Sequence, residues 1–463
     1  MVFSSVVFLF AYLPLVLLGY YLLGKKAQIY YLFVLNLVFY GWGEPLYVLL
    51  MIVSILLNYG FALAIKKRPR CRKLWLVSSI VVNLGILGYF KYTNFFVDNL
   101  SVLIPALRNL SIPEVVLPIG ISFYTFQCMS YVFDVYLGDV EAQKNPLLFG
   151  TYVALFPQLI AGPIVRYRDV NEELKNRTIT LTDIDAGLKR FIVGLGKKVL
   201  LANAMGQLWE SLAAAPAQNG VLGSWVGIIA YTFQIYFDFS GYSDMAIGLG
   251  RMLGFHFLEN FNYPYIAQSI TDFWRRWHIS LSSWFRQYVY IPLGGNRKGL
   301  KRQLLNLLIV WLLTGLWHGA SWNFVLWGLY FAVLLVVEKT FLLRILSKTS
   351  RAVRHLYALF FIVLGWALFY FTDSASLFAF LKTLVSGTQA FGANALRLFI
   401  AYLPTMLVCA LASTPLAASL WRKLPVSDTL RIPLESVGAL VLFLLCCAAI
   451  LGQTYNPFIY FRF

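Results

Sequence analysis

Charged residues are scarce in this chain. Only 13% of its 463 residues are Asp, Glu, Lys or Arg, whereas 60% are hydrophobic and 17% are aromatic. An average globular chain has about 25% charged residues and less than half apolar ones. A water-soluble fold of this length could not bury so much apolar surface, so most of the chain must lie in lipid. Disordered, coiled-coil and disulfide-scaffold proteins are excluded by the same composition.

The chain also lacks metal-binding and disulfide patterns. Its five cysteines have no metal-type spacing, and Cys446 and Cys447 are adjacent in an apolar run, which is typical of packing residues. No P-loop, dinucleotide fingerprint, nucleophile elbow or His-Glu-x-x-His pair stands in a context that would support one. We expect no metal site and no permanently bound cofactor.

The few charges are mostly positive. Lys and Arg number 38 against 20 Asp and Glu, which gives a formal net charge of +18. In a soluble protein this excess would suggest nucleic acid. In a membrane protein, Lys and Arg gather in cytoplasmic loops and beside anionic headgroups. We therefore expect contact with membrane lipid and no nucleic-acid partner.

Long hydrophobic runs are abundant. A spanning helix needs about 20 mostly apolar residues, and about ten to twelve segments qualify. The candidate spans are 2–23, 29–42, 46–65, 74–96, 116–137, 147–165, 187–205, 222–250, 304–337 (alternatively two short helices), 354–372, 395–420 and 433–452. The first run has no basic n-region, so it is interpreted as a retained membrane helix. The sequence predicts an all-α polytopic membrane protein.

Basic clusters orient the first helices. Lys25 and Lys26 follow the first span, and a run of Lys and Arg at 66–73 follows the third. Because positive residues concentrate on the cytoplasmic side, we expect both clusters there, with 166–177 as a further cytoplasmic loop. This arrangement places the N-terminus on the outside.

Residues 255–302 differ from the plain apolar spans. Between 272 and 302, seven Lys or Arg residues, interleaved with aromatic ones, stand against a single acid, Asp272. Aromatic rings alternating with Arg suit an interfacial or re-entrant segment. Non-helical backbone survives at membrane depth only where protein or a wet cavity satisfies it. We therefore predict a cavity along this segment.

Two histidines lie where they could do chemistry. His318 lies in an otherwise apolar stretch with no acid nearby in sequence, and an imidazole can take up and return a proton near neutral pH. His278 follows the Trp/Arg motif and on a helix would share a face with Trp274 and Arg275. A neutral core histidine and an interfacial anchor are the respective structural alternatives.

A second polar group lies inside the apolar run 222–250. Ser240 and Asp244 are four residues apart and would share a helix face, whereas Asp238 would project elsewhere. The group could hold a nucleophile or a base. It could also form a buried hydrogen-bond network that pairs an Asp with an Arg of 275–286, and we favour this supporting role.

Together these motifs resemble the membrane-bound O-acyltransferase (MBOAT) family, and within it the bacterial alginate O-acetyltransferase branch. Peptidoglycan O-acetylation and teichoic-acid D-alanylation proteins are close to that branch. The matching motifs are 2–5 (VFSS), 118–127 (PIGISFYTFQ), 157–164 (PQLIAGPI), 238–246 (DFSGYSDMA), 273–282 (FWRRWHISLS), 317–322 (WHGASW) and 457–463 (PFIYFRF).

The resemblance implies a fold of membrane helices with re-entrant segments around a central tunnel that joins a cytoplasmic donor entrance to an extracytoplasmic acceptor entrance. It implies one MBOAT domain over 1–463, with N-terminal helices (1–115), a catalytic core (116–340) and C-terminal helices (341–463). His318 matches the family's catalytic histidine, and His278 matches a second histidine of the same site.

The implied reaction moves an acyl group, expected to be acetyl, from a cytoplasmic thioester to an extracytoplasmic hydroxyl. His318 would be the base or a transient acyl acceptor. The donor would be acetyl-CoA or an acylated carrier protein, whose phosphates suit Arg and Lys. The supporting or substrate-binding candidates are Asp238, Ser240, Asp244, Trp274, Arg275, Arg276, Trp317, Ser321, Asn323, Arg297 and Lys298.

Relatives in this branch work with a separate extracytoplasmic SGNH-type esterase or transferase. We therefore expect such a partner, a polysaccharide acceptor that is acylated directly or through it, and residence in the bacterial inner membrane. Three alternatives stay open: D-alanyl transfer from a carrier protein to teichoic acid, transport of a lipid-linked glycan with His318 as a proton relay, and a scaffold that only recruits an extracytoplasmic enzyme.

Overall fold

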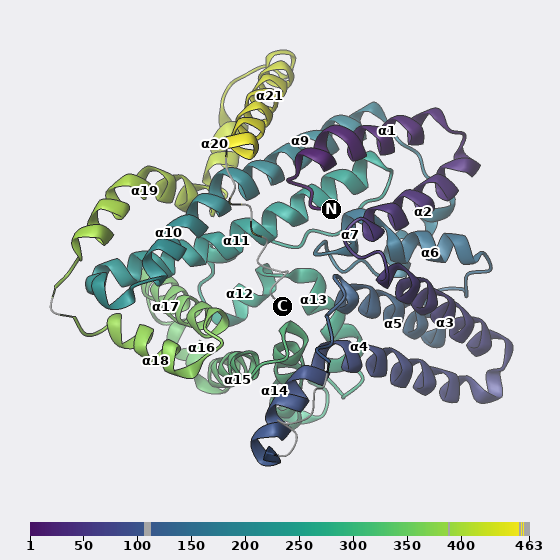
Figure 1. Cartoon of the computed structure of the whole chain (residues 1–463), viewed down its shortest axis with the longest axis horizontal. Helices are drawn as coiled ribbons and strands as arrows, with labels where there is room; N and C mark the ends of the chain where they lie inside the picture. The colour runs from purple at the N-terminus through teal and green to yellow at the C-terminus, as the bar shows by residue number, and fades with distance from the viewer. Residues whose placement is uncertain (106–112, 388, 453–454, 456, 458–463) are drawn as a thin grey trace. The chain divides into compact units, whose positions relative to one another are not determined.

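The computed structural model describes the whole chain except residues 106–112, 388, 453–454, 456 and 458–463. Every regular element in the described part is a helix or a helical turn, which confirms the all-α prediction (Figure 1). The chain divides into two compact units. One consists of Met1–Phe191 and Met245–Leu258, and the other of Ile192–Asp244 and Glu259–Phe463. Of the terminal motif 457–463, all but Pro457 lies outside the described residues.

Several helices are long and apolar enough to cross a membrane, and the chain is a multi-pass membrane protein. Six helices of the described part meet both criteria: Tyr47–Lys67, Pro69–Leu103, Gly220–Met252, Arg351–Tyr370, Ala393–Ala412 and Thr429–Gly452. Phe8–Leu22 is a shorter apolar helix. A 20-residue helix is about 30 Å long, which matches the hydrocarbon core of a bilayer.

The first unit is built mainly from the N-terminal helices. These are η1 (Phe8–Tyr12), α1 (Leu13–Leu22), α2 (Lys25–Gly41), α3 (Tyr47–Lys67), η2 (Pro69–Cys71), α4 (Arg72–Leu103), α5 (Ile121–Leu137), α6 (Pro146–Ala154), α7 (Phe156–Leu159) and α8 (Tyr167–Lys175). The helices α3, α4 and α5 pack against one another (Figure 1). Two longer helices, α9 (Leu181–Gly196) and α11 (Gly220–Met252), contribute residues to both units.

Glycines set both ends of α5. Gly120 and Gly138 flank the helix with φ of 75° and 86°, a left-handed conformation that glycine adopts without steric cost. A Cβ at Gly120 would also lie 2.6 Å from the Leu159 carbonyl oxygen. The helix therefore begins at Ile121, later than the start of the predicted span 116–137.

The predicted span 147–165 is not one helix. α6 ends at Ala154, and Leu155 turns away from helical geometry with ψ of 108° before the short α7 begins. Pro157, inside α7, cannot donate the backbone hydrogen bond that a continuous helix would require. A turn and four residues without regular structure then lead into α8.

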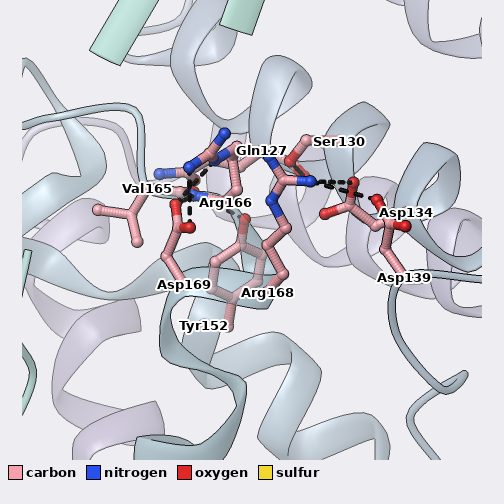
Figure 2. A network of polar contacts seen from close by, with 9 residues as sticks. All are labelled: Gln127, Ser130, Asp134, Asp139, Tyr152, Val165, Arg166, Arg168 and Asp169. Carbon is pink, nitrogen blue, oxygen red and sulfur yellow. Dashed lines mark hydrogen bonds and ion pairs between the residues drawn. The ribbon is translucent and has the colours of Figure 1, made fainter. Parts of the chain in front are cut away.

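Ion pairs anchor the start of α8 within the first unit. The Arg166 side chain donates to both carboxylate oxygens of Asp169 at 2.8 and 2.9 Å. Arg168 lies 3.2 Å from a carboxylate oxygen of Asp139 and 4.0 Å from one of Asp134 at the end of α5 (Figure 2). The Arg166–Asp169 pair therefore stabilises the first turn of α8, and Arg168 ties this turn to the end of α5.

The second unit holds the remaining helices. They are η4 (Lys197–Ala202), α10 (Asn203–Ala213), η5 (Pro216–Gln218), η6 (Pro264–Ile266), α12 (Ile270–Arg276), α13 (Ile279–Phe285), η7 (Arg286–Tyr290), α14 (Gly299–His318), α15 (Trp322–Val337), η8 (Glu338–Leu342), α16 (Leu343–Leu346), α17 (Arg351–Tyr370), α18 (Ser374–Thr383), α19 (Ala393–Ala412), α20 (Leu416–Lys423) and α21 (Asp428–Gly452). The segment 255–302 forms short helices and turns.

The apolar stretch 304–337 is a helical hairpin, the second of the two predicted alternatives. α14 and α15 pack closely because glycines lie at their contact. A Cβ at Gly315 would be 2.3 Å from the Phe324 carbonyl oxygen, and one at Gly328 would be 2.5 Å from that of Trp311. Only glycine permits so close an approach of the two backbones.

Candidate active site

The α14–α15 hairpin places His318 at its turn. His318 is the last residue of α14, and Gly319 follows it in an extended conformation before α15 begins. The imidazole is buried and packs edge-on against the rings of Trp317, Trp327 and Phe369, at centroid distances of 5.0, 5.0 and 5.4 Å. These rings restrict the orientation of the imidazole.

His278 lies in the junction between α12 and α13. Its φ of 46° and ψ of 56° are left-handed, and Tyr263 is the other non-glycine residue with positive φ in the described part. A left-handed conformation of a non-glycine residue costs on the order of 1 kcal/mol and often occurs at functional sites. The side chain is fully buried in this position.

Asn260 fixes the tautomer of His278. The imidazole Nδ1 lies 3.1 Å from Asn260 Oδ1, which also accepts from the backbone N–H and the hydroxyl of Ser280 at 3.2 and 2.9 Å. The Asn260 amide nitrogen donates to Ser243 Oγ at 3.1 Å, which sets the orientation of the amide. Because an amide oxygen only accepts, Nδ1 of His278 carries the hydrogen. Nε2 therefore presents its lone pair, and it has no hydrogen-bond partner within the described residues.

The neutral form of His278 is also favoured electrostatically. His278 lies between two short helices, outside the candidate membrane spans. Burial lowers the pKa of its imidazole to about 3, because the charged form would lose its hydration. At physiological pH the ring is neutral, and its free nitrogen can accept a proton or a hydrogen bond.

Both histidines line one cavity of about 240 Å³. Its wall includes Trp274 and Arg275 of α12, together with Arg286 and Thr314. The two histidines are 40 positions apart in the sequence, and the short helices α12 and α13 and the α14–α15 hairpin bring them to one cavity. The predicted cavity along 255–302 is therefore present.

A second, basic cavity of about 540 Å³ adjoins the first and shares Arg275, Arg286 and Tyr290 with it. Arg297 and Lys339 complete its positive lining, and none of the described residues that line it is acidic. These four cationic side chains form no ion pair within the described part of the chain. Their charge is available to an anionic ligand.

Comparison with known proteins identifies the family of the chain. The model of the MBOAT (membrane-bound O-acyltransferase) family matches residues 121–381. The Probable alginate O-acetylase AlgI of Azotobacter vinelandii is 45% identical over 80% of this chain and 75% of its own length. The protein of that name in Pseudomonas putida is 41% identical over the whole of both chains. The Peptidoglycan O-acetyltransferase of Helicobacter pylori is 34% identical over 84% of this chain and 79% of its own.

The chain belongs to the MBOAT family. This confirms the resemblance that the sequence motifs carry, and it makes the protein a membrane O-acyltransferase that uses an acyl donor.

The other predicted residues of this MBOAT protein are distributed unevenly around the two cavities. Trp274 lines the histidine cavity, Arg297 lines the basic one, and Arg275 lines both. Arg276 donates to Asp272 at 2.8 Å, and this pair keeps its guanidinium occupied. Lys298 lines neither cavity.

Three candidates beside His318 support the hairpin. Trp317 packs against the His318 ring, and Asn323 donates to the Phe369 carbonyl oxygen at 3.3 Å, which ties α15 to the end of α17. Ser321 occupies the position directly before α15. Ser321 and Asn323 do not line the histidine cavity.

The polar group of α11 pairs with lysines. Lys198 lies 2.7 Å from Asp238, with both side chains almost fully buried, and Lys197 lies 2.6 Å from Asp244. The prediction that an Arg of 275–286 would be the partner is wrong, because the irregular helical turn η4 presents both lysines to α11. Ser240 is buried in the same helix.

Sequence reasoning missed four residues of this region. Asn260 and Glu338 hold the His278 segment, and Arg286 and Lys339 complete the basic cavity. Among these four, only Glu338 is marked by a sequence feature, because it is an acid at the end of a long apolar run. The positive charge of Arg286 and Lys339 does not distinguish them from the other basic residues of the chain.

Proposed function

We propose that this MBOAT protein transfers an acetyl group from a cytoplasmic thioester to a hydroxyl on the other side of the membrane, for O-acylation of an extracytoplasmic polysaccharide. One observation carries the proposal: both histidines line a cavity that shares Arg275 and Arg286 with a larger basic cavity. The names of the relatives, alginate O-acetylase and peptidoglycan O-acetyltransferase, support acetyl as the group and a polysaccharide as the acceptor.

The basic cavity suits the phosphates of the donor. Acetyl-CoA and an acylated carrier protein both carry phosphate close to the pantetheine arm, and guanidinium groups bind phosphate through paired hydrogen bonds. With phosphate held by Arg297 and Lys339, the thioester end would extend past Arg275 and Arg286 toward the histidines.

The chemistry requires a proton acceptor and a stabilised oxyanion. The acceptor hydroxyl gives its proton to an imidazole while its oxygen forms a bond to the thioester carbon. The carbon–sulfur bond then breaks, and the departing thiolate takes the proton back from the imidazolium. General-base catalysis by one residue contributes about 10²–10⁴-fold. His318 is that base. In the alternative route, a His318 nitrogen bonds to the thioester carbon and the thiolate leaves. The hydroxyl oxygen then attacks the acyl carbon, the bond from that carbon to the His318 nitrogen breaks, and Nε2 of His278 accepts the hydroxyl proton and passes it to the thiolate.

The distribution of charge supports one topology. We place the protein in the bacterial inner membrane with the N-terminus outside, because the basic clusters at 25–26 and 66–73 favour the cytoplasm. The final acceptor is reached directly or through an extracytoplasmic SGNH-type transferase. The second candidate function is transfer of D-alanyl, which differs from acetyl transfer in that the donor is a D-alanyl carrier protein.

Release of free thiol from acetyl-CoA tests the proposal. In liposomes that contain the purified protein, thiol release should depend on an added acceptor, and His318→Ala should abolish it. His256→Ala is the matched control, because this histidine is more than half exposed, pairs with Glu173 and lines neither cavity. Thiol release from a D-alanyl carrier protein alone would favour the second candidate. Glycan transport without any thioester would refute acyl transfer.

A further inference from the structure

The turn between η7 and α14 forms one wall of the basic cavity. The residues of this turn that line the cavity include Gly294, Gly295, Asn296 and Arg297. Gly294 and Gly295 have φ of 104° and 55°, in the left-handed region that favours glycine. Glycine loses more conformational freedom on folding than any other residue, so contacts from outside the turn are needed to order it. We call residues 293–297 the glycine turn.

Arg302 and Gln303 hold the glycine turn from the first turn of α14. Nε of Arg302 donates to the Leu293 carbonyl oxygen at 3.2 Å. Nε2 of Gln303 donates to the hydroxyl of Tyr290, just before the glycine turn, at 3.1 Å. Arg302 is exposed, and Gln303 itself lines the basic cavity. Because water or a ligand can compete for both bonds, they restrain the turn only weakly.

Asn306 holds the same turn from inside the protein. Its fully buried side-chain amide nitrogen donates to the carbonyl oxygens of Gly295 and Leu293, at 3.0 and 3.4 Å. Oδ1 of Asn306 has no hydrogen-bond partner within the described residues. The amide cannot be reversed, because its oxygen would then face two carbonyl oxygens that only accept. An unpaired buried oxygen is costly, so the two bonds to the turn are what this asparagine contributes.

The same helix carries Asn306 and His318. Positions 306 and 318 are twelve residues apart on α14, which corresponds to about 18 Å along the axis of an α-helix. The extended pantetheine arm of acetyl-CoA covers a comparable distance between its phosphate and its thioester. α14 therefore fixes the distance from the glycine turn, which carries Arg297, to the histidine at the end of the helix.

We propose that Asn306 is a positioning residue of the donor site. By holding the glycine turn, it keeps Arg297 at the level of α14 from which a bound phosphate places the thioester at the histidines. Asn306 lines neither cavity, so it acts through the turn and not by touching the donor. This role rests on the proposed acyl transfer, but it concerns the binding of the donor and not the transfer step.

Steady-state release of thiol by the full chain in liposomes, measured with two donors, tests the proposal. In Asn306→Leu, KM for acetyl-CoA should rise about fivefold while kcat changes less than about twofold, because a loosened turn weakens the hold on phosphate and leaves the histidines in place. S-acetylpantetheine has the same thioester and arm but no phosphate, so its KM should be the same in the variant and in wild type. Asn306→Ser retains one donor and should raise KM for acetyl-CoA by a smaller factor, and it keeps the test valid if the leucine variant does not fold.

A double variant shows whether Asn306 acts through Arg297. KM for acetyl-CoA in Asn306→Leu combined with Arg297→Gln should equal that of Arg297→Gln alone, because the turn then has no guanidinium to position. Effects of the two substitutions that multiply, or the same rise of KM for S-acetylpantetheine, would overturn the proposal. Inactivity of wild type with acetyl-CoA would contradict the proposed function instead, whereas an active wild type and an unchanged KM in Asn306→Leu would refute only the role of Asn306.

Asn83→Leu is the matched control for the loss of a buried amide. Asn83 is a buried asparagine of α4 in the first unit, and its amide nitrogen donates to Asn58 Oδ1 and to the Ser79 carbonyl oxygen, both at 2.8 Å. It lines neither cavity. Asn83→Leu should therefore lower the temperature of thermal unfolding without changing KM for acetyl-CoA. A rise of KM in this variant equal to that in Asn306→Leu would mean that KM reports only a weakened fold, which would also overturn the proposal.

Discussion

At the scale of single residues, the site depends on which nitrogen of His278 holds its hydrogen. Asn260→Leu removes the acceptor for Nδ1–H, so either tautomer becomes possible, and acyl transfer should fall about tenfold or more. Asn260→Asp keeps an oxygen in that place and should restore part of the rate. The acetyl-CoA-dependent release of thiol by purified, folded variants measures both effects.

The Asp variant should also change the dependence on pH. A carboxylate beside Nδ1 stabilises the imidazolium, so it raises the pKa of His278 from the low value that burial gives it. The imidazole must be neutral to accept a proton. When the pH is lowered, Asn260→Asp should therefore lose activity at a higher pH than wild type does. An unchanged pH profile, or full activity of Asn260→Leu, would argue against a role for Asn260 in positioning His278.

The adjacent residues Arg275 and Arg276 offer a matched pair. Arg275 lines both the basic cavity and the histidine cavity, whereas Arg276 is held by Asp272. Arg275→Gln should raise KM for acetyl-CoA about tenfold with a smaller change in kcat, which corresponds to about 1.4 kcal/mol of binding energy. Arg276→Gln should leave KM nearly unchanged. Steady-state kinetics with acetyl-CoA at two ionic strengths measure KM for both variants. The same change of KM in both would contradict a donor site that includes Arg275.

At the scale of elements, Glu338 holds the start of α12. Its carboxyl oxygens accept from the backbone N–H groups of Ile270 and Thr271 at 2.6 and 2.8 Å, and from the Thr271 and Tyr357 hydroxyls. Glu338→Gln turns an amide NH₂ toward these donors and should destabilise the fold by about 2 kcal/mol. Thermal unfolding in detergent measures the loss. Glu141→Gln, at an exposed surface pair, should change it little.

The elements also explain what the sequence could and could not predict. The lengths of the apolar runs predicted the bounds of helices such as α3 and α17 to within a few residues, because an apolar run long enough to cross the lipid is sufficient to form such a helix. The break at Leu155 depends on local backbone geometry that composition does not reveal. The motifs predicted His278 and His318, but Asn260 and Glu338 act on partners 18 and 68 positions away. Such long-range hydrogen bonds leave no pattern in a single sequence.

At the scale of the whole molecule, the proposed reaction requires the donor and the acceptor to enter from opposite sides of the membrane. The basic cavity includes Lys339, directly after α15, and the proposed function gives it the anionic donor. A donor that enters at this end would come from the cytoplasm in the proposed topology, whereas the acceptor lies on the other side of the membrane. This arrangement makes the orientation of the chain a testable part of the mechanism.

A native cysteine reports that orientation. Cys71 is exposed in the basic run 66–73, whereas three of the other cysteines are buried and Cys447 is intermediate. In spheroplasts, a membrane-impermeant maleimide should label Cys71 only after the membrane is permeabilised. In a Cys71→Ser background, Lys301→Cys near the start of α14 should behave likewise, but Asp373→Cys, just after the end of α17, should react in intact cells. Labelling of Cys71 from outside, or of both introduced cysteines from one side, would contradict opposite entrances for donor and acceptor.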